Sequence, residues 1–210
     1  KEYFELLETL LWENGNYFLL DYHLKRLRKS ADYFLFNFDQ EKIATELKNI
    51  SSNLNENVKY KVRLLLNKWG STKIEYSEIA ENHAEANVAL SRKIRCENEK
   101  FLYHKTTYRP WDEELRIAKQ KGFDEVLFVN EKDELLEGAI SNIVIEKNGK
   151  LFTPPLSLGI LNGCYRQYLI DQNLCNERLL TLEDLRNADK IFICNSVREM
   201  IEISKFFNDL

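Results

Sequence analysis

One lysine of the chain lies among neighbours that suit covalent or acid–base chemistry. Lys105 is surrounded in the sequence by Tyr103, Thr106, Thr107 and Tyr108, which make a polar but uncharged setting. A lysine amine reacts as a nucleophile or base only when it is neutral, and its pKa shifts readily on desolvation. Lys105 is therefore a candidate for a reactive amine. The alternative is an ordinary surface lysine.

A candidate carboxylate follows in an apolar context. Glu137 is surrounded by Leu135, Leu136, Ala139 and Ile140, which predict that it is partly buried. A buried carboxylate needs a hydrogen-bonding or cationic partner. Glu137 could therefore bind a cationic group of a ligand, and the alternative is an exposed glutamate at the end of a strand.

Two features could bind an anion such as a phosphate. Gly163, Cys164 and Tyr165 stand at the start of a predicted helix, where backbone N–H groups and the helix dipole favour negative charge. Arg26, with Arg28 as an alternative, offers a planar guanidinium that donates two hydrogen bonds at once. The alternatives are a common glycine turn before a helix and the solvated face of an amphipathic helix.

Other chemistries lack their motifs. The chain has no glycine-rich dinucleotide or P-loop signature and no His-Glu-x-x-His or Gly-x-Ser-x-Gly motif. Its 3 histidines offer few metal or triad candidates, and its 4 cysteines form no Cys-x-x-Cys pair. A net charge of -4 without a basic field argues against nucleic-acid binding. We expect a cytoplasmic protein with reduced cysteines, no metal and no membrane partner.

The first half of the chain is typical of an α+β domain. An Asn14-Gly15 turn between two apolar runs predicts a hairpin. Apolar residues at helical spacing predict a helix over 22–36, with Asp21 as its N-cap. The further expected elements are a helix over 40–54 and strands within 58–70, 71–79 and 87–95.

The second half predicts a second α+β region. A polar, aromatic-rich stretch over 101–122 leads into a helix at 113–121, and a helix starts near 163. The expected strands lie within 125–155, with turns at 131–133 and 147–149, and on both sides of a loop within 189–203. We therefore expect a small domain over 1–100, a larger β-rich cofactor domain over 101–210, and a cleft between them.

Five segments in order resemble the class IV (fold type IV) pyridoxal-phosphate enzymes, which include branched-chain and D-amino-acid aminotransferases and aminodeoxychorismate lyase. They are HLKRL at 23–27, HKTTYR at 104–109, LLEGAISN at 135–142, LFTPPLSLGILNGCYR at 151–166 and ICNSVRE at 193–199. The resemblance spans nearly the whole chain and implies a two-domain α+β, or α/β, fold similar to D-amino-acid aminotransferase.

The resemblance also implies roles for individual residues. Lys105 would carry pyridoxal 5'-phosphate as a Schiff base and act as the catalytic base, and Glu137 would face the pyridine nitrogen. Arg26, Cys164, Tyr165 and Ser196 would bind the phosphate, the middle two through their backbone. Thr9, Tyr108, Arg109 and Asn195 would line the substrate pocket.

Within the family, the segments FELLETLLW, HKTTYR, DEVLFVNE and CNSV look most like aminodeoxychorismate lyase, including the lyase domain fused to aminodeoxychorismate synthase component I. The implied reaction is the cleavage of 4-amino-4-deoxychorismate to 4-aminobenzoate and pyruvate, a step of folate biosynthesis. The alternatives are a branched-chain or D-amino-acid aminotransferase, which would use the same Lys105 and Glu137, and a non-catalytic domain of the same fold.

The chain also departs from the family pattern at its start. Family members have a further strand and loop before the equivalent of FELLETL, so we expect a small domain truncated at its N-terminus. An unpaired sheet edge is a liability unless another chain covers it. A homodimer partner, or a fused or associated synthase, would serve.

Overall fold

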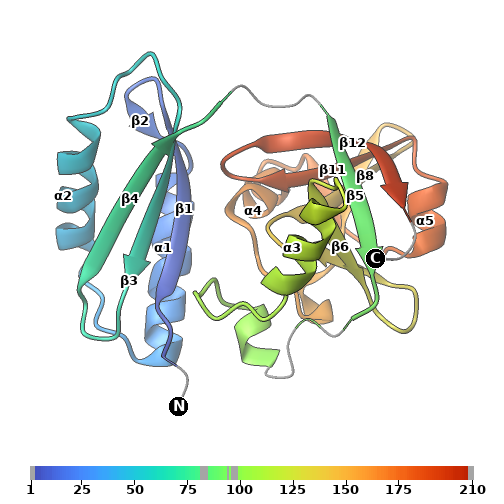
Figure 1. Ribbon diagram of the computed structural model, residues 1–210, viewed down its shortest axis with the longest axis horizontal. Coiled ribbons are helices and arrows are strands. Elements are labelled where there is room, and N and C mark those ends of the chain that lie inside the picture. The colour runs from blue at the N-terminus through green and yellow to red at the C-terminus, as the bar shows by residue number, and fades with distance from the viewer. Residues whose placement is uncertain (1–2, 81–84, 94, 96–98, 208–210) are drawn as a thin grey trace. The chain divides into compact units, whose positions relative to one another are not determined.

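The computed structural model describes residues 3–80, 85–93, 95 and 99–207, with the side chains of 205–207 left out. The chain divides into two compact units (Figure 1). Unit 1 comprises residues 1–82 and 104–108, and unit 2 comprises 83–103 and 109–210. The division thus lies nearer residue 82 than the predicted 100. Lys105 belongs to unit 1, because the segment around it pairs with the first strand of the chain.

Unit 1 is built on a four-stranded antiparallel sheet in the order β2-β1-β3-β4. The strands are β1 (Leu6–Glu13), β2 (Asn16–Tyr17), β3 (Tyr60–Leu66) and β4 (Thr72–Glu78). The predicted hairpin is confirmed between β1 and β2. Asn14 and Gly15 have φ values of 50° and 78°, as the favoured two-residue hairpin turn requires.

Two helices cover this sheet, α1 (Leu20–Phe34) and α2 (Gln40–Ser51). Their apolar stripes pack against alternate residues of β1 and β3, as period-2 alternation in a strand dictates. Both helices were predicted. The N-cap assignment was wrong, because α1 begins after Leu19 in the left-handed conformation, and Asp21 lies in its first turn. The shared core contains Leu6, Leu10, Trp12, Leu24, Leu27, Ala31, Ile43, Leu47, Val62, Leu64 and Leu66.

The segment 104–108 returns to unit 1 from a distant part of the sequence. Thr106 forms an antiparallel bridge with Leu6. The Leu7 N–H donates to the Lys105 carbonyl at 3.0 Å, and the Thr107 N–H donates to the Glu5 carbonyl at 2.9 Å. Since β3 occupies the other edge of β1 along its length, the segment lies on the same edge as β2. It therefore extends the sheet.

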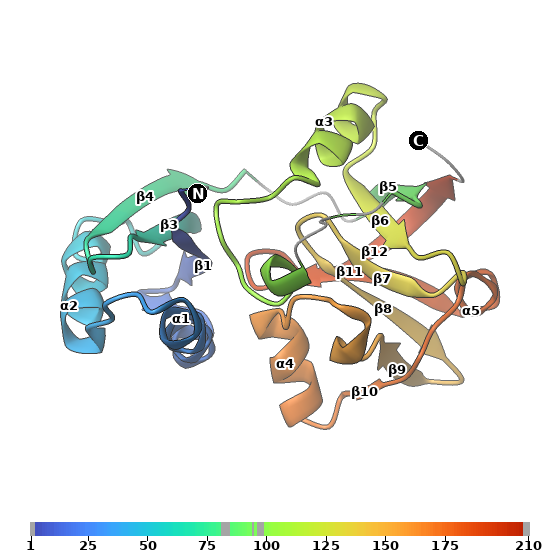
Figure 2. The same cartoon turned by 90° about the horizontal axis from the view of Figure 1, so that it is seen from below.

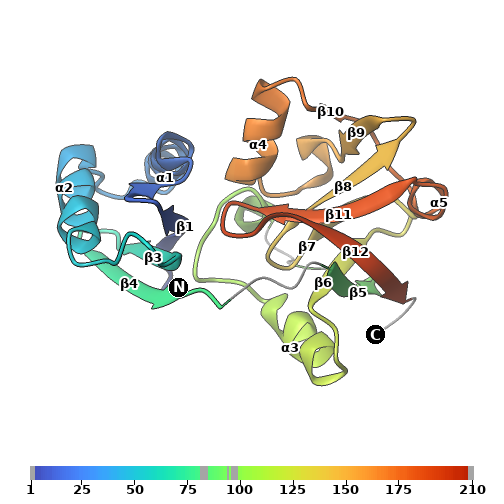
Figure 3. The ribbon, with the colours of Figure 1, turned by 90° about the horizontal axis from the view of Figure 1, so that it is seen from above.

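Unit 2 is built on a mixed eight-stranded sheet in the order β10-β9-β8-β11-β12-β5-β6-β7. Figure 2 and Figure 3 show that this sheet is strongly curved. The strands are β5 (Glu85–Ser91), β6 (Glu125–Val129), β7 (Leu135–Gly138), β8 (Asn142–Lys147), β9 (Lys150–Thr153), β10 (Cys175–Glu177), β11 (Lys190–Asn195) and β12 (Glu199–Phe207). β5 runs parallel to both β6 and β12, although these strands lie far apart in sequence.

Two helices of unit 2 pack against its sheet and contribute to two apolar clusters. α3 (Asp112–Gln120) packs Leu115 and Ala118 against Ala89, Val126 and Phe128. A larger cluster gathers residues of β5, β6, β8, β11 and β12 with those of α5 (Leu182–Arg186). The remaining helices are α4 (Cys164–Asp171) and the 3-10 turns Glu99–Leu102 and Leu156–Leu158. Among the described residues, no helix is long and apolar enough to cross a membrane.

Candidate active site

In unit 1, the backbone of Lys105 is held on both sides. Its carbonyl accepts from Leu7, and the next residues pair with Leu6 and Glu5. The preceding His104 is buried and lies within 2.9 Å of the Ser30 hydroxyl on α1. The His104 ring also stacks on Tyr33 with ring centroids 4.5 Å apart. Strand pairing and helix contacts thus position the candidate lysine.

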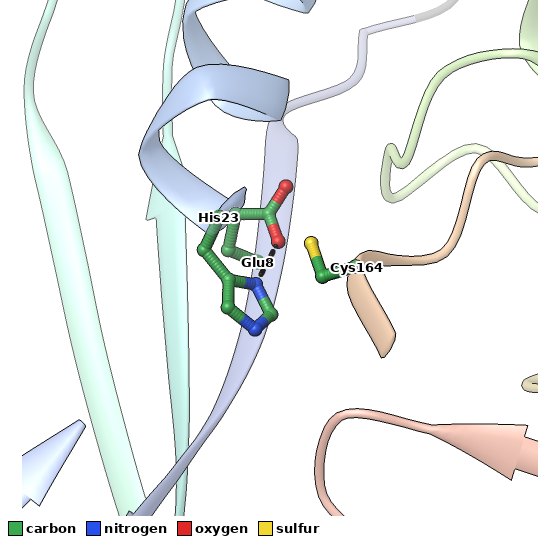
Figure 4. Close-up of side chains that lie close together, drawn as sticks. All are labelled: Glu8, His23 and Cys164. Atoms are coloured by element: carbon green, nitrogen blue, oxygen red, sulfur yellow. Dashed lines mark hydrogen bonds and ion pairs between the residues drawn. The ribbon is translucent and has the colours of Figure 1, made fainter. Parts of the chain in front are cut away.

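A buried charge cluster lies between β1 and α1 of the same unit. Glu8 on β1 accepts from Arg26 through Nε at 2.9 Å and through Nη2 at 2.5 Å. It also lies 2.6 Å from the His23 Nδ1. Figure 4 shows the Glu8 carboxylate facing the His23 ring. Only 1% of either Glu8 or His23 is exposed, so this carboxylate neutralises Arg26 inside the unit.

The protonation states in this cluster follow from its geometry. Burial raises the pKa of Glu8, but the Arg26 charge and the hydrogen bonds from His23 and Arg26 outweigh it and bring the pKa to about 2. Burial lowers the pKa of His23, and the charges of Arg26 and Lys105 lower it further against the effect of Glu8. His23 is therefore neutral at pH 7. It donates its Nδ1–H to the ionised Glu8.

The other candidates of unit 1 lie close to these residues in the fold. Thr9 follows Glu8 on β1 and pairs with Arg63 of β3. The Tyr108 carbonyl accepts from the Thr106 hydroxyl at 3.2 Å, which closes the segment that carries Lys105. Arg28, the alternative to Arg26, is instead engaged with α2. Its guanidinium donates to Gln40 at 3.1 Å and lies over the Phe38 ring.

In unit 2, Glu137 is a buried carboxylate with several donors. Arg95 forms an ion pair with it. The Leu161 N–H reaches both of its oxygens at 3.1 Å, and the Asn142 side-chain amide donates to Oε2 at 3.2 Å. Glu137 is 7% exposed and Arg95 6%. The expected partial burial of Glu137 agrees with this arrangement, and both of its oxygens accept hydrogen bonds.

The glycine at the start of α4 is required by a close approach. A Cβ added to Gly163 would lie 2.0 Å from the Asn142 Oδ1. Asn142 donates to Leu161 at 3.0 Å as well as to Glu137, so it ties the α4 entrance to the candidate carboxylate. The φ of Gly163 is -60°, a conformation open to any residue. Contact with Asn142, rather than backbone freedom, therefore demands glycine here.

Cys164 and Tyr165 form the first turn of α4, and both are buried. The first N–H groups of any helix lack intrahelical acceptors, so they can bind an anion. Burial raises the pKa of Tyr165 to about 12, so its phenol stays protonated. Arg166 of α4 is 1% exposed. Its guanidinium donates to the Asn162 Oδ1 at 2.9 Å and to the Pro154 carbonyl at 2.8 Å, and these bonds hold the start of the helix.

Asn195 ends β11, and Ser196 begins the turn that leads to β12. The Asn195 Oδ1 accepts from the N–H groups of Val197 and Arg198, each at 3.0 Å, and its amide lies 3.4 Å from the Ile140 carbonyl. Ser196 is buried. The side chain of Asn195 is therefore largely occupied in shaping the turn, a use that the sequence pattern for a turn predicts.

Arg109 has structural partners in unit 2. Its guanidinium donates to the Ala139 carbonyl at 2.6 Å and to Asp112 at 2.9 Å, and it lies 5.5 Å from the Trp111 ring centre. The Trp111 indole N–H donates to the same carbonyl at 3.2 Å. Arg109 is thus engaged with the turn after β7, which weakens the case for it as a substrate ligand.

The predicted site residues fall into two groups, one in each unit. Arg26, Lys105, Thr9 and Tyr108 belong to unit 1, and all the others belong to unit 2. Sequence reasoning missed Glu8, His23, Arg95 and Asn142. A signal existed for Glu8, since a glutamate within an otherwise apolar strand needs a buried partner. Arg95 and Asn142 carried no such signal.

Comparison with known proteins places the whole chain in one family. The family model for amino-transferase class IV matches residues 5–206. A Schizosaccharomyces pombe protein, provisionally named aminodeoxychorismate lyase, is 27% identical over 207 residues, which are 93% of this chain and 87% of that protein.

Solved structures agree with the sequence relationship. A crystal structure provisionally named an amino-acid aminotransferase from Mesorhizobium loti superposes with a TM-score of 0.85 at 29% identity, covering 96% of this chain and 99% of that one. The PLP-bound form of a hypothetical aminotransferase from Mycobacterium tuberculosis superposes with a TM-score of 0.82 at 21% identity, covering 96% and 81%, and shares the fold. With a family match over nearly its full length, the chain belongs to the class IV aminotransferase family.

Proposed function

We propose that the chain is a pyridoxal-phosphate enzyme that cleaves 4-amino-4-deoxychorismate to 4-aminobenzoate and pyruvate. The family match supports the enzyme class. The alignment with the Schizosaccharomyces pombe protein over 93% of the chain carries the choice of a lyase. The proposed step belongs to folate biosynthesis, takes place in the cytoplasm and is carried out by a homodimer.

The residues present fit this cofactor. Glu137 is a buried carboxylate held by Arg95, Asn142 and the Leu161 N–H, and a buried carboxylate suits a pyridinium nitrogen as a partner. The first N–H groups of α4 can bind an anion. They follow Gly163, where any side chain would clash with Asn142. Arg26, Cys164, Tyr165 and Ser196 would hold the phosphate, and Lys105 would bind the aldehyde carbon covalently. The bound cofactor supplies an electron sink for the substrate carbon that carries the amine.

Lys105 would move the proton in the proposed reaction. Its amine would accept the proton from the amine-bearing ring carbon of the substrate. The electron pair left there would form the last double bond of an aromatic ring as the neighbouring ring C–O bond breaks, and the enolpyruvate that leaves would take up a proton to become pyruvate. The Leu7 N–H holds the Lys105 carbonyl and the Glu5 carbonyl holds the Thr107 N–H, so the backbone around Lys105 is fixed.

Thr9, Tyr108, Arg109 and Asn195 remain the proposed substrate residues. Thr9 lies on β1, two residues after the Leu7 that donates to the Lys105 carbonyl, and Tyr108 ends the segment that carries Lys105. Since the Arg109 guanidinium is engaged by Ala139 and Asp112, we expect it to act mainly by shaping the turn.

A class IV aminotransferase acting on branched-chain or D-amino acids is the second candidate. The Mesorhizobium loti structure, at 29% identity, bears an aminotransferase name, which favours this reading. In such an enzyme Lys105 would move a proton between the substrate α-carbon and the cofactor. The two activities differ in product, since only a transaminase converts an added amino acid to its keto acid.

The first test is the visible spectrum of the protein mixed with pyridoxal phosphate. Wild type is expected to develop the absorption band of a lysine-bound cofactor, and Lys105→Ala is expected to lack it. The control Lys25→Ala removes an exposed lysine of α1 and should leave the band intact. A wild type without the band would rule out the proposed cofactor chemistry.

The second test separates the two candidate reactions. Release of 4-aminobenzoate and pyruvate from 4-amino-4-deoxychorismate, without keto-acid formation from added amino acids, supports the lyase. The reverse pattern supports the transaminase. Light scattering of the same sample gives the mass in solution and so tests the proposed homodimer. Mass spectrometry of any protein that co-purifies tests the proposed association with a synthase.

A further inference from the structure

Unit 2 contains a second buried carboxylate to which the proposed function gives no role. Glu125, the first residue of β6, is 1% exposed. Within the described residues it has no ion pair with a lysine, arginine or histidine. Burial raises its pKa, and hydrogen bonds from Ser141 and from the N–H groups of Val126, Ile140 and Ala139 act in the opposite direction. A buried carboxylate held only by neutral donors is uncommon enough to need a reason.

The donors to Glu125 come almost entirely from one turn. The Ala139 N–H donates to Oε1 at 3.0 Å, the Ile140 N–H to Oε2 at 3.2 Å, and the Ser141 hydroxyl to Oε2 at 2.6 Å. The fourth donor is the N–H of Val126, beside Glu125 in the sequence. The carboxylate therefore collects the donors of the Gly138–Ser141 turn, which joins β7 to β8.

The same turn is fixed from its carbonyl side. Arg109 and Trp111 both donate to the Ala139 carbonyl. A Cβ added to Gly138 would meet the Glu125 carboxylate at 2.9 Å and the Ser141 Oγ at 2.6 Å, so the chain packs directly against the carboxylate. The turn thus has little freedom to move, although the Ile140 side chain at its tip is exposed.

The residues on either side of this turn belong to the candidate active site. Glu137 precedes Gly138, and Asn142 follows Ser141. Asn142 donates to Glu137 and to Leu161 at the entrance of α4. A displacement of the turn would therefore alter the spacing between Glu137 and Asn142, and with it the entrance of α4.

We propose that Glu125 is a positioning residue, which fixes the Gly138–Ser141 turn and thereby sets Glu137 and Asn142 in place for the cofactor. The statement that Glu125 fixes the turn concerns the protein alone. The statement that the turn sets Glu137 and Asn142 in place for the cofactor rests on the proposed function. The two statements can therefore be tested separately.

The turn is tested in cofactor-free protein by amide hydrogen exchange. The Ile140 amide is the sharpest probe, because within the described residues it donates to Glu125, whereas the Ala139 N–H also donates to the Val126 carbonyl. Glu125→Gln keeps the shape but replaces one acceptor oxygen with an NH2 group. Because hydrogen bonds to charged groups are strong, exchange at Ile140 should accelerate about tenfold or more. Glu131→Gln, at an exposed glutamate of the same unit, should leave it unchanged.

The consequence for the site is tested by binding of pyridoxal phosphate well below the melting temperature. Glu125→Gln should weaken cofactor binding about tenfold and shift the pH titration of the visible band, because Glu137 is displaced from the pyridine nitrogen. A merely structural glutamate would lower the melting temperature and move neither quantity in the folded protein.

Two results would overturn the proposal. Unchanged exchange at Ile140 in Glu125→Gln would show that Glu125 does not fix the turn. Faster exchange with unchanged affinity and pH titration would show that the turn does not position Glu137. If Glu125→Gln does not fold, Glu125→Asp, which keeps the charge but shortens the reach, is expected to give the same two effects. A wild type that binds no cofactor refutes the proposed function, while the exchange result still decides the role of Glu125 at the turn.

Discussion

At the residue scale, four glutamates are buried in the part of the chain that the structure describes, and their partners differ in kind. Glu8 pairs with Arg26 and His23, Glu137 pairs with Arg95, and Glu125 is held by neutral donors of one turn. The fourth, Glu114, pairs with the exposed Lys93. Each carboxylate must recover the hydration that it loses on burial. The partners therefore differ in kind, with a guanidinium in unit 1, another guanidinium at Glu137 in unit 2, and the neutral donors of one turn at Glu125.

Replacing Glu8 with glutamine should destabilise the protein strongly. The substitution leaves the mostly buried Arg26 guanidinium, 13% exposed, without its carboxylate, and breaking a buried pair from one side costs about 3–5 kcal/mol. Urea unfolding of the cofactor-free protein measures the difference. Glu13→Gln is the matched control on the same strand, because Glu13 pairs with the exposed Lys59 and such pairs contribute about 1 kcal/mol or less. Equal costs for the two variants would contradict the assignment of a buried cluster.

The same residue predicts a dependence on pH. Since the folded-state pKa of Glu8 is about 2, below the ordinary value, its contribution to stability is complete above the ordinary pKa and is lost as pH falls toward 2. The contribution is about 3 kcal/mol by linkage. The unfolding free energy of wild type should therefore fall more steeply below pH 5 than that of Glu8→Gln. Parallel curves for the two proteins would contradict the lowered pKa.

At the element scale, close packing at strand and helix ends decides which residue types are possible. Asn142 begins β8, Glu137 lies near the end of β7, and Gly163 precedes α4. These three ends meet through the side chain of Asn142, which occupies the space that a side chain at Gly163 would need. The element ends, rather than the element interiors, therefore hold the candidate residues of unit 2.

Replacing Gly163 with alanine should destabilise unit 2 by steric overlap alone. The added Cβ would lie 2.0 Å from the Asn142 Oδ1, and overpacking of this kind costs about 1–3 kcal/mol. Thermal unfolding measures the loss. The double variant with Asn142→Ala should recover part of it, because the clashing atom is gone. A double variant whose cost is the sum of the two single costs would show that the residues do not interact.

At the scale of the whole molecule, each unit is assembled from distant parts of the sequence. Unit 1 takes Lys105 from a segment that lies beyond residues assigned to unit 2. Unit 2 places β5 between β6 and β12, so residues near position 88 lie beside residues near 126 and 206. A predicted boundary near residue 100 could not anticipate this exchange, because no local pattern records which strand a short polar segment will join.

Local patterns determined many of the elements, and the family resemblance supplied the candidate residues. The Asn14-Gly15 turn, the helical stripes of α1 and α2 and the alternation in β1 and β3 could be predicted because each depends on neighbours within a few positions. The family segments pointed to Lys105 and Glu137, and the family match supports the class to which these segments were assigned.

Tertiary structure decided the partners. The contacts of the candidate residues join different elements. Examples are Glu8 with Arg26, Glu137 with Arg95, Asn142 with Leu161, and Glu125 with Ser141. Such contacts are set by strand order and helix docking, and these depend on the packing of a whole core rather than on any local run of residues. The chemistry of each candidate group follows from its residue type, but its protonation state and its position follow from the fold.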